Sequence, residues 1–145
     1  MRQKEFLAAL DRARIVDAIG AAEKMTSGEI RVHIQPKAYG DIRHVAERTF
    51  ERLGMTKTAQ RIGVLLFIAS EDQRFVILGD QGIDARVPVG FWDDIASKLH
   101  DRFQHGELTE GIVDAIHSAG EELRTYFPRA HDDVDELANE INIEQ

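Results

Sequence analysis

The stretch Ile62–Ala69, which reads IGVLLFIA, is the longest apolar block of the chain. Its length suits a strand and is far below the roughly 20 apolar residues that a membrane-spanning helix requires. Because the block has no polar face, it is typical of a strand covered on both sides. We therefore expect it to be the central strand of a sheet.

The segments on either side of this block predict its neighbours in the sheet. Glu29–Gln35 alternates apolar and polar residues, which predicts a half-buried strand. A helix predicted over residues 41–53 lies between the two strands, so they should be parallel. Residues 70–73 resemble a tight turn, so Arg74–Leu78 should form an antiparallel hairpin with the central strand.

Helical patterns occupy both ends of the chain. Residues 4–24 carry apolar groups at helical spacing with a break near Ala13, and two further helices are expected over residues 91–103 and 108–126. The order of two helices, a strand, a helix, a hairpin and two helices predicts an α/β fold. The expected architecture is a three-layer α/β/α sandwich with a short mixed central sheet flanked by helices.

The chain is expected to form one domain over residues 1–128, followed by an acidic segment over residues 129–145. Apolar residues in the last segment recur at helical spacing beside several acids: Val134, Leu137, Ala138 and Ile141. This pattern favours a short amphipathic helix, either docked on the domain or offered to a protein partner. Of the two, docking on the domain is the simpler interpretation.

Composition and charge exclude several classes of function. The 145 residues include 18 Lys and Arg against 26 Asp and Glu, a net charge of −8, and no cysteine. The acidic balance weighs against a nucleic-acid partner, and the lack of cysteine excludes disulfides, thiol nucleophiles and thiolate metal sites. With no secretory or membrane-spanning segment recognised, we expect a cytoplasmic protein without membrane insertion. The sequence leaves the oligomeric state open.

The segment Gly79–Asp84 is the strongest candidate site. It places Asp80 and Asp84 among glycines at the end of a strand, where main-chain carbonyls can approach a hard cation. Glu29 and Asp72 are further carboxylates that would reach the same sheet edge if the strand order allows it. Oxygen ligands of this kind favour calcium or magnesium over zinc or copper. The alternative is an ordinary Asp/Gly turn.

Other acidic and histidine residues are better explained structurally. Four residues form a stripe along the last predicted helix, opposite its apolar face: Glu110, Asp114, His117 and Glu121. We expect that stripe to face solvent. His33 is placed on the polar face of its strand, and His100 and His105 near a helix C-terminus, where a positive charge is favourable.

Several stretches in order resemble the TPM domain family. They are TSGEIRV at residues 26–32, GVLLFIA at residues 63–69, and GDQGI at residues 79–83, within a resemblance that covers residues 10–127. The resemblance implies an α/β/α sandwich. It also implies divalent-cation binding through acidic loop residues, carried here by Asp80, Glu29 and Asp72, and acid phosphatase activity in some members.

Three functions remain open from the sequence. The first is a stand-alone TPM-type domain that binds calcium or magnesium and has a binding or assembly role, with no established catalysis. The second is a metal-assisted phosphomonoesterase, for which arginines near the strand ends would contact phosphoryl oxygens: Arg31, Arg61, Arg74 and Arg86. The third is a metal-independent protein-docking domain.

Overall fold

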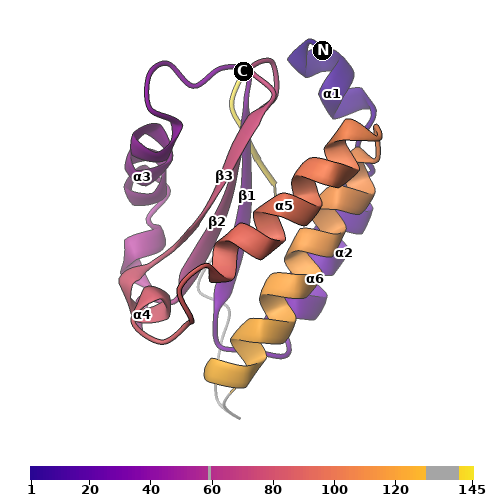
Figure 1. Cartoon of the computed structure of the whole chain (residues 1–145). Helices are drawn as coiled ribbons and strands as arrows, with labels where there is room; N and C mark the ends of the chain where they lie inside the picture. The colour runs from indigo at the N-terminus through magenta and orange to yellow at the C-terminus, as the bar shows by residue number, and fades with distance from the viewer. Residues whose placement is uncertain (59, 130–140) are drawn as a thin grey trace.

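The computed structural model describes residues 1–58, 60–129 and 141–145, which form one sheet with helices on both faces (Figure 1). The elements in chain order are α1 (Gln3–Ala8), α2 (Arg12–Glu23), β1 (Glu29–Gln35), α3 (Ile42–Arg52), the 3-10 turn η1 (Met55–Lys57), β2 (Gly63–Ala69), β3 (Arg74–Gly79), α4 (Gln81–Asp84), α5 (Phe91–Gln104), α6 (Leu108–Tyr126) and β4 (Ile141–Ile143). The predicted α/β sandwich is confirmed.

The sheet has the strand order β3-β2-β1-β4. β1 and β2 run parallel, with Ile30 opposite Val64, and β2 and β3 form the antiparallel hairpin that the sequence predicts. β2 is buried along its whole length. The expectation of a half-buried β1 is wrong: β4 adds a neighbour on its outer edge, Glu29 and His33 are buried, and Arg31 and Gln35 are partly buried.

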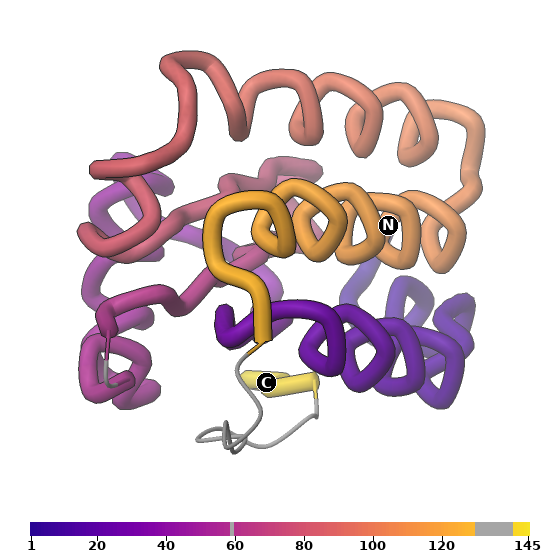
Figure 2. Tube along the Cα trace, turned by 90° about the horizontal axis from the view of Figure 1, so that it is seen from below, coloured from indigo at the N-terminus to yellow at the C-terminus, as the bar shows by residue number. Residues whose placement is uncertain are grey.

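Two apolar clusters lie on the two faces of the sheet. Because side chains alternate along a strand, Ile30 and Val64 join one cluster, and Leu65 and Phe67 join the other. The first cluster is covered by α2, α5 and α6, and α6 lies between the other two helices (Figure 2). The second is covered by α3 and η1, with Phe50 packed on β2.

The last strand replaces part of the helix expected near the chain end. Ile141, which the sequence analysis places on a helical face, lies in β4, parallel to β1 and opposite Val32. A strand forms there because Ile141 and Ile143 turn together toward the first apolar cluster. The other three apolar positions of the expected helix, at 134, 137 and 138, lie outside the described residues.

Both ends of the chain lie at the same end of the sheet, as Figure 1 shows. The side chain of Gln3 is buried, and its Nε2 donates to the carbonyl oxygen of Glu144 at 2.7 Å. The Oε1 of Gln3 accepts from Ser70 Oγ at 3.1 Å. Gln3 therefore ties the N-terminal helix both to the β2–β3 turn and to the residue that follows β4.

Among the described residues, no helix combines the length and the apolar character needed to cross a membrane.

Candidate functional site

The segment expected to be a cation-binding loop is a short helix, α4, that starts at the end of β3. Asp80 caps this helix: its side chain accepts from the backbone N–H of Gln81 at 2.8 Å. Asp is among the best N-caps, so its position before Gln81 has a structural cause. Gly82 is required because a Cβ there would lie 2.2 Å from the carbonyl oxygen of Gln60.

Asp80 forms a bidentate ion pair with Arg61. The Arg61 Nε and Nη2 donate to the two carboxylate oxygens of Asp80 at 2.6 and 2.8 Å. Asp80 is only 7 % exposed, and its hydrogen bond raises the pKa of Arg61 above its already high ordinary value. The guanidinium thus stays charged and compensates the buried carboxylate. Arg61 adopts a left-handed backbone, with φ of 58°.

Asp84 lies one helical turn beyond Asp80 and is exposed. Its Oδ1 accepts from the indole Nε1 of Trp92 at 3.3 Å. Its second oxygen makes no hydrogen bond to any residue in the part of the chain that the structure describes. The Trp92 ring lies against Gly79, where a Cβ would be 2.6 Å from the ring. Gly79 and Trp92 together hold Asp84 beside the end of β3.

Glu29 lies at the same end of the sheet but on a more distant strand. It starts β1 opposite Gly63, whose carbonyl accepts from the Asp80 N–H at 2.9 Å. Glu29 and Asp80 are therefore two strand spacings apart, about 10 Å between their backbones. The Met55 carbonyl and the Phe50 ring lie over Gly63, 3.3 and 3.5 Å from where its Cβ would be. These groups occupy the space between the two carboxylates.

Asp72 lies at the opposite end of the sheet from the other three candidates. β3 runs from Arg74, opposite Ala69, to Gly79, opposite Val64, so the hairpin turn is about 15 Å or more from Asp80. The Asp72 carboxylate accepts from the Ala38 N–H at 2.8 Å and from Arg74 at 3.3 Å. The Ala38 hydrogen bond, followed by Arg74, lowers the pKa of Asp72.

Asp80 and Asp84 thus lie together on one short helix, the strand order leaves Glu29 nearby but separated, and the length of β3 places Asp72 at the opposite end of the sheet. Among residues 1–58, 60–129 and 141–145, no three His, Asp or Glu side chains are grouped as a metal site requires. A cation near α4 would need main-chain carbonyls to complete its ligands. The carbonyls of Gln60 and Arg61 are close to Gly82. We name Asp80–Asp84 with residues 60–61 the α4 corner.

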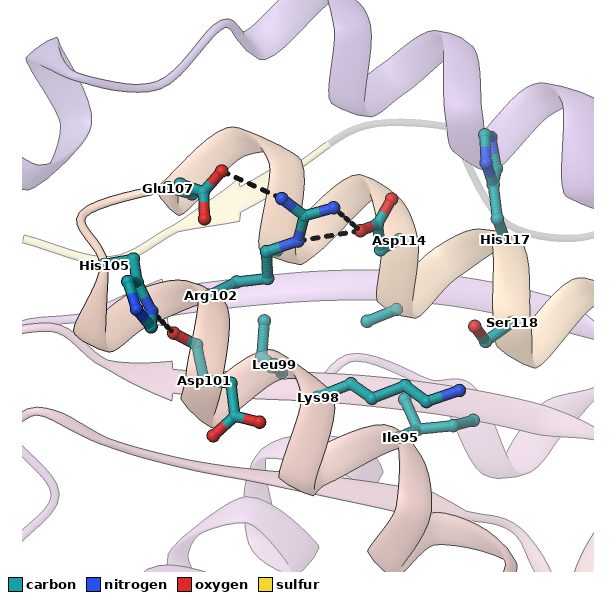
Figure 3. Close-up of a pocket in the computed structure, with 12 residues that line it drawn as sticks. Ile95, Lys98, Leu99, Asp101, Arg102, His105, Glu107, Asp114, His117 and Ser118 are labelled. Carbon is teal, nitrogen blue, oxygen red and sulfur yellow. Dashed lines mark hydrogen bonds and ion pairs between the residues drawn. The ribbon is translucent and has the colours of Figure 1, made fainter.

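The acidic stripe on α6 faces solvent and is used in ion pairs. Glu110 pairs with Arg14 at 3.2 Å and Glu121 with Arg124 at 3.0 Å. Asp114 and Glu107 both contact Arg102, at 2.8 Å each, in a hollow of about 540 Å³ between α5 and α6 (Figure 3). These contacts raise the pKa of Arg102.

His33 does not lie on a polar face, and that expectation is wrong. Its side chain is fully buried and stacks on Phe67 at 5.2 Å between ring centroids. Its two ring nitrogens lie 2.8 Å from Gln35 Oε1 and 2.7 Å from Asn142 Nδ2. Asn142 belongs to β4 and lies directly beside His33 in the sheet, so a strand distant in sequence supplies this partner. Burial lowers the pKa of His33, although Gln35 opposes this effect.

Residues 1–122 match the family model described as the TPM domain. The chain belongs to the TPM domain family. This TPM domain is also similar to a solved structure, the NMR structure of BA42 protein from the psychrophilic bacterium Bizionia argentinensis sp. nov.. The two are 44 % identical over 92 % of each chain, with a TM-score of 0.87. The TPM domain has no match among the curated proteins.

Proposed function

We propose that this TPM domain is a binding module whose α4 corner binds a divalent cation, calcium or magnesium. The observation that supports this most is the pairing of Asp80 and Asp84 within one turn of helix, beside the main-chain carbonyls of residues 60–61. Carboxylate and carbonyl oxygens are the ligands that these cations prefer.

The charge around Asp80 sets the expected affinity. Arg61 already compensates the Asp80 carboxylate, so Asp84 supplies the remaining negative charge of the α4 corner. Calcium sites with few charged ligands bind in the range of about 10⁻⁴ to 10⁻³ M. We therefore expect weak binding by the parent protein. A cation that also takes Asp80 must displace Arg61.

A titration of ¹⁵N-labelled protein with calcium chloride, then with magnesium chloride, tests this function. Amide shifts should saturate and be confined to residues 60–63 and 79–84. Asp84→Asn should weaken calcium binding about tenfold or more, because it removes the charged ligand. Arg61→Asn should strengthen it, because Asp80 loses its cation partner and Asn tolerates the left-handed backbone.

Asp17→Asn is the matched control, since it removes one negative charge from an exposed position on α2. It should leave calcium affinity unchanged. Shifts spread over all acidic surfaces, or equal effects of Asp17→Asn and Asp84→Asn, would mean that the net charge merely attracts counter-ions. Hydrolysis of p-nitrophenyl phosphate that is lost in Asp80→Asn would favour the phosphomonoesterase alternative instead.

A further inference from the structure

The C-terminal strand β4 is held to β1 over a short length. Residues 141–143 pair in parallel with residues 32–34 of β1. Beyond this pairing, the Glu144 N–H donates to the Ile34 carbonyl at 2.8 Å, and the side chains of β4 are only partly buried. A short strand with few buried contacts opens at a lower free energy than the core of a sheet. A single further contact therefore has a large influence on whether β4 stays paired.

One such contact joins the middle residue of β4 to the buried histidine of β1. Asn142 lies directly beside His33 in the sheet, with its Nδ2 at 2.7 Å from the His33 Nδ1. On the other side of the ring, the His33 Nε2 lies 2.8 Å from the Gln35 Oε1. The residue is 0 % exposed and its ring stacks on Phe67. Water therefore reaches neither ring nitrogen while β4 is paired.

The hydrogen-bond partners of His33 select the neutral ring. The Gln35 Oε1 can only accept, so the His33 Nε2 carries the proton. Gln35 is held in this orientation because its own Nε2 donates to the Lys37 carbonyl at 2.7 Å. The His33 Nδ1 then accepts from the Asn142 Nδ2. A second proton on Nδ1 would place two donors against each other, so protonation removes this hydrogen bond between the strands.

The charged groups around His33 act in both directions. Glu144, directly after β4, has its Oε2 at 3.6 Å from the His33 Nε2 and favours a positive ring. Arg52 of α3 and Arg31 of β1 disfavour it, and Arg52 is itself paired with Glu144 at 3.3 Å. The β2 side chain that stacks on the ring is an uncharged phenylalanine. Burial outweighs the hydrogen bond with Gln35 and the attraction of Glu144, so the pKa of His33 is lowered from 6.5.

We propose that protonation of His33 detaches β4 from β1, so that the C-terminal strand is an acid-sensitive cover of the β1 edge. Detachment removes Asn142 and Glu144 from the ring, and water then reaches Nδ1. The open form takes up a proton near the ordinary pKa of 6.5, whereas the paired form resists it. Acid therefore favours the open form, in which residues 32–34 present an unpaired strand edge.

Amide hydrogen exchange of the whole chain measures the opening of β4. The probe is the Glu144 N–H, which donates to the Ile34 carbonyl. Its protection factor, which corrects for the intrinsic effect of pH on exchange, should fall several-fold, up to about tenfold, between about pH 7.5 and about pH 5.5. In up to about 1 M urea the Glu144 exchange rate should stay constant, because a local opening exposes little surface. Amides of the buried strand β2 that exchange through global unfolding should accelerate.

His33→Gln should make the protection of the Glu144 amide independent of pH, because glutamine does not titrate. His117→Gln, at an exposed position on α6, should keep the fall seen in the parent. Equal protection of the parent's Glu144 amide at both pH values would overturn the proposal. So would a fall of the parent's size in His33→Gln, or exchange of Glu144 only through the urea-dependent unfolding that opens β2.

A second variant serves if His33→Gln does not fold. Asn142→Asp places a carboxylate beside the His33 Nδ1, which accepts from the protonated ring and favours its positive charge. Protection of the Glu144 amide should then rise on acidification instead of falling. A fall of the parent's size in Asn142→Asp would mean that the contact between His33 and β4 does not control the opening.

Discussion

At the scale of single residues, Arg61 combines an unfavourable backbone with a favourable side-chain contact. Its φ of 58° lies in the left-handed region, and its guanidinium holds Asp80 through two hydrogen bonds. A side chain with a Cβ is disfavoured in that region, whereas glycine is not. The ion pair with Asp80 favours arginine at a position where the left-handed backbone alone would favour glycine.

Two substitutions separate the backbone of Arg61 from its side chain. Arg61→Gly and Arg61→Ala both lose the ion pair, but only alanine keeps the left-handed strain. We expect the glycine variant to be more stable by about 1 kcal/mol, measured by urea denaturation. Equal stability of the two variants would show that the loop relaxes away from this conformation.

His33 makes stability depend on pH. Burial lowers its pKa in the folded state below the ordinary value of 6.5. Between these two values the unfolded chain binds more protons than the folded chain. The free energy of unfolding therefore falls as the pH falls below 6.5 toward the folded-state pKa.

His33→Gln should reduce this pH dependence, because glutamine carries no titrating group. The measurement is urea denaturation at about pH 7.5 and about pH 5.5, where the loss of stability on acidification should be smaller than in the parent. His117→Gln, at an exposed position on α6, should keep the parent's dependence. An identical loss in parent and His33→Gln would assign the acid sensitivity to other groups.

At this scale, local signals could be predicted and distant partners could not. The helix predicted over residues 41–53 begins at a local signal, Asp41, whose side chain caps α3 by accepting from Arg43 N at 3.0 Å. The ion pair of Asp80 with Arg61, 19 positions earlier, has no local signal in the sequence. The burial of His33 has no local signal either, because its partners Phe67 and Asn142 are distant in sequence.

At the scale of elements, β4 is the smallest strand and has a clear energetic role. Ile141 and Ile143 pack on the first apolar cluster, and the Glu144 N–H donates to the Ile34 carbonyl at 2.8 Å. Glu144 also pairs with Arg52 at 3.3 Å. β4 therefore covers the otherwise open edge of β1, which is a template for pairing between chains.

Removing residues 141–145 should destabilise the domain by about 2 kcal/mol, since two partly buried isoleucines lose their contacts. Thermal or urea denaturation measures this loss, and light scattering should reveal association through the exposed β1 edge. A matched control, Ile141→Asn with Ile143→Asn, keeps the backbone and should lose stability without the association. Unchanged stability of the truncated chain would mean that β4 does not support the fold.

The elements themselves were largely predictable, because period and capping are local. The apolar block at residues 62–69 indicated the buried central strand, and the hairpin followed from its short turn. β4 escaped prediction because three residues are too few to establish a period. The helical spacing of Ile141 with residues 134, 137 and 138 favours a helix. In the structure Ile141 instead pairs with Val32 of the neighbouring strand β1.

At the scale of the whole molecule, the candidate carboxylates are divided between the two ends of the sheet. The α4 corner lies at the end of β3, and Asp72 lies beyond its start, at the opposite end of the sheet. Residues this far apart without shared partners usually have additive effects. The four candidate carboxylates therefore cannot form one site.

Asp72→Asn tests this separation. It should lower thermal stability at neutral pH, because Asp72 holds both Ala38 and Arg74, and leave calcium affinity unchanged. The lowered pKa of Asp72 means that this stabilisation exists above its ordinary pKa and is lost as the pH falls through the folded-state value. A calcium affinity that falls in Asp72→Asn would place a cation at the hairpin end instead.

Strand order is the information that the sequence lacked about the site. Asp80 and Asp84 are close in sequence, so their proximity was foreseeable. Asp72 precedes and Asp80 follows the strand predicted over Arg74–Leu78, so that strand alone already separates them. Whether Glu29 joins Asp80 depends on strand order, which follows only from non-local pairing.

The hydrogen bond from Gln3 to the Glu144 carbonyl makes the beginning and end of this chain spatial neighbours. A short linker could join residue 145 to residue 1 with little loop-closure entropy. New ends could then be opened at Gly40, an exposed glycine with φ of 86° between β1 and α3. Because its two ends are neighbours, the chain is suited to circular permutation.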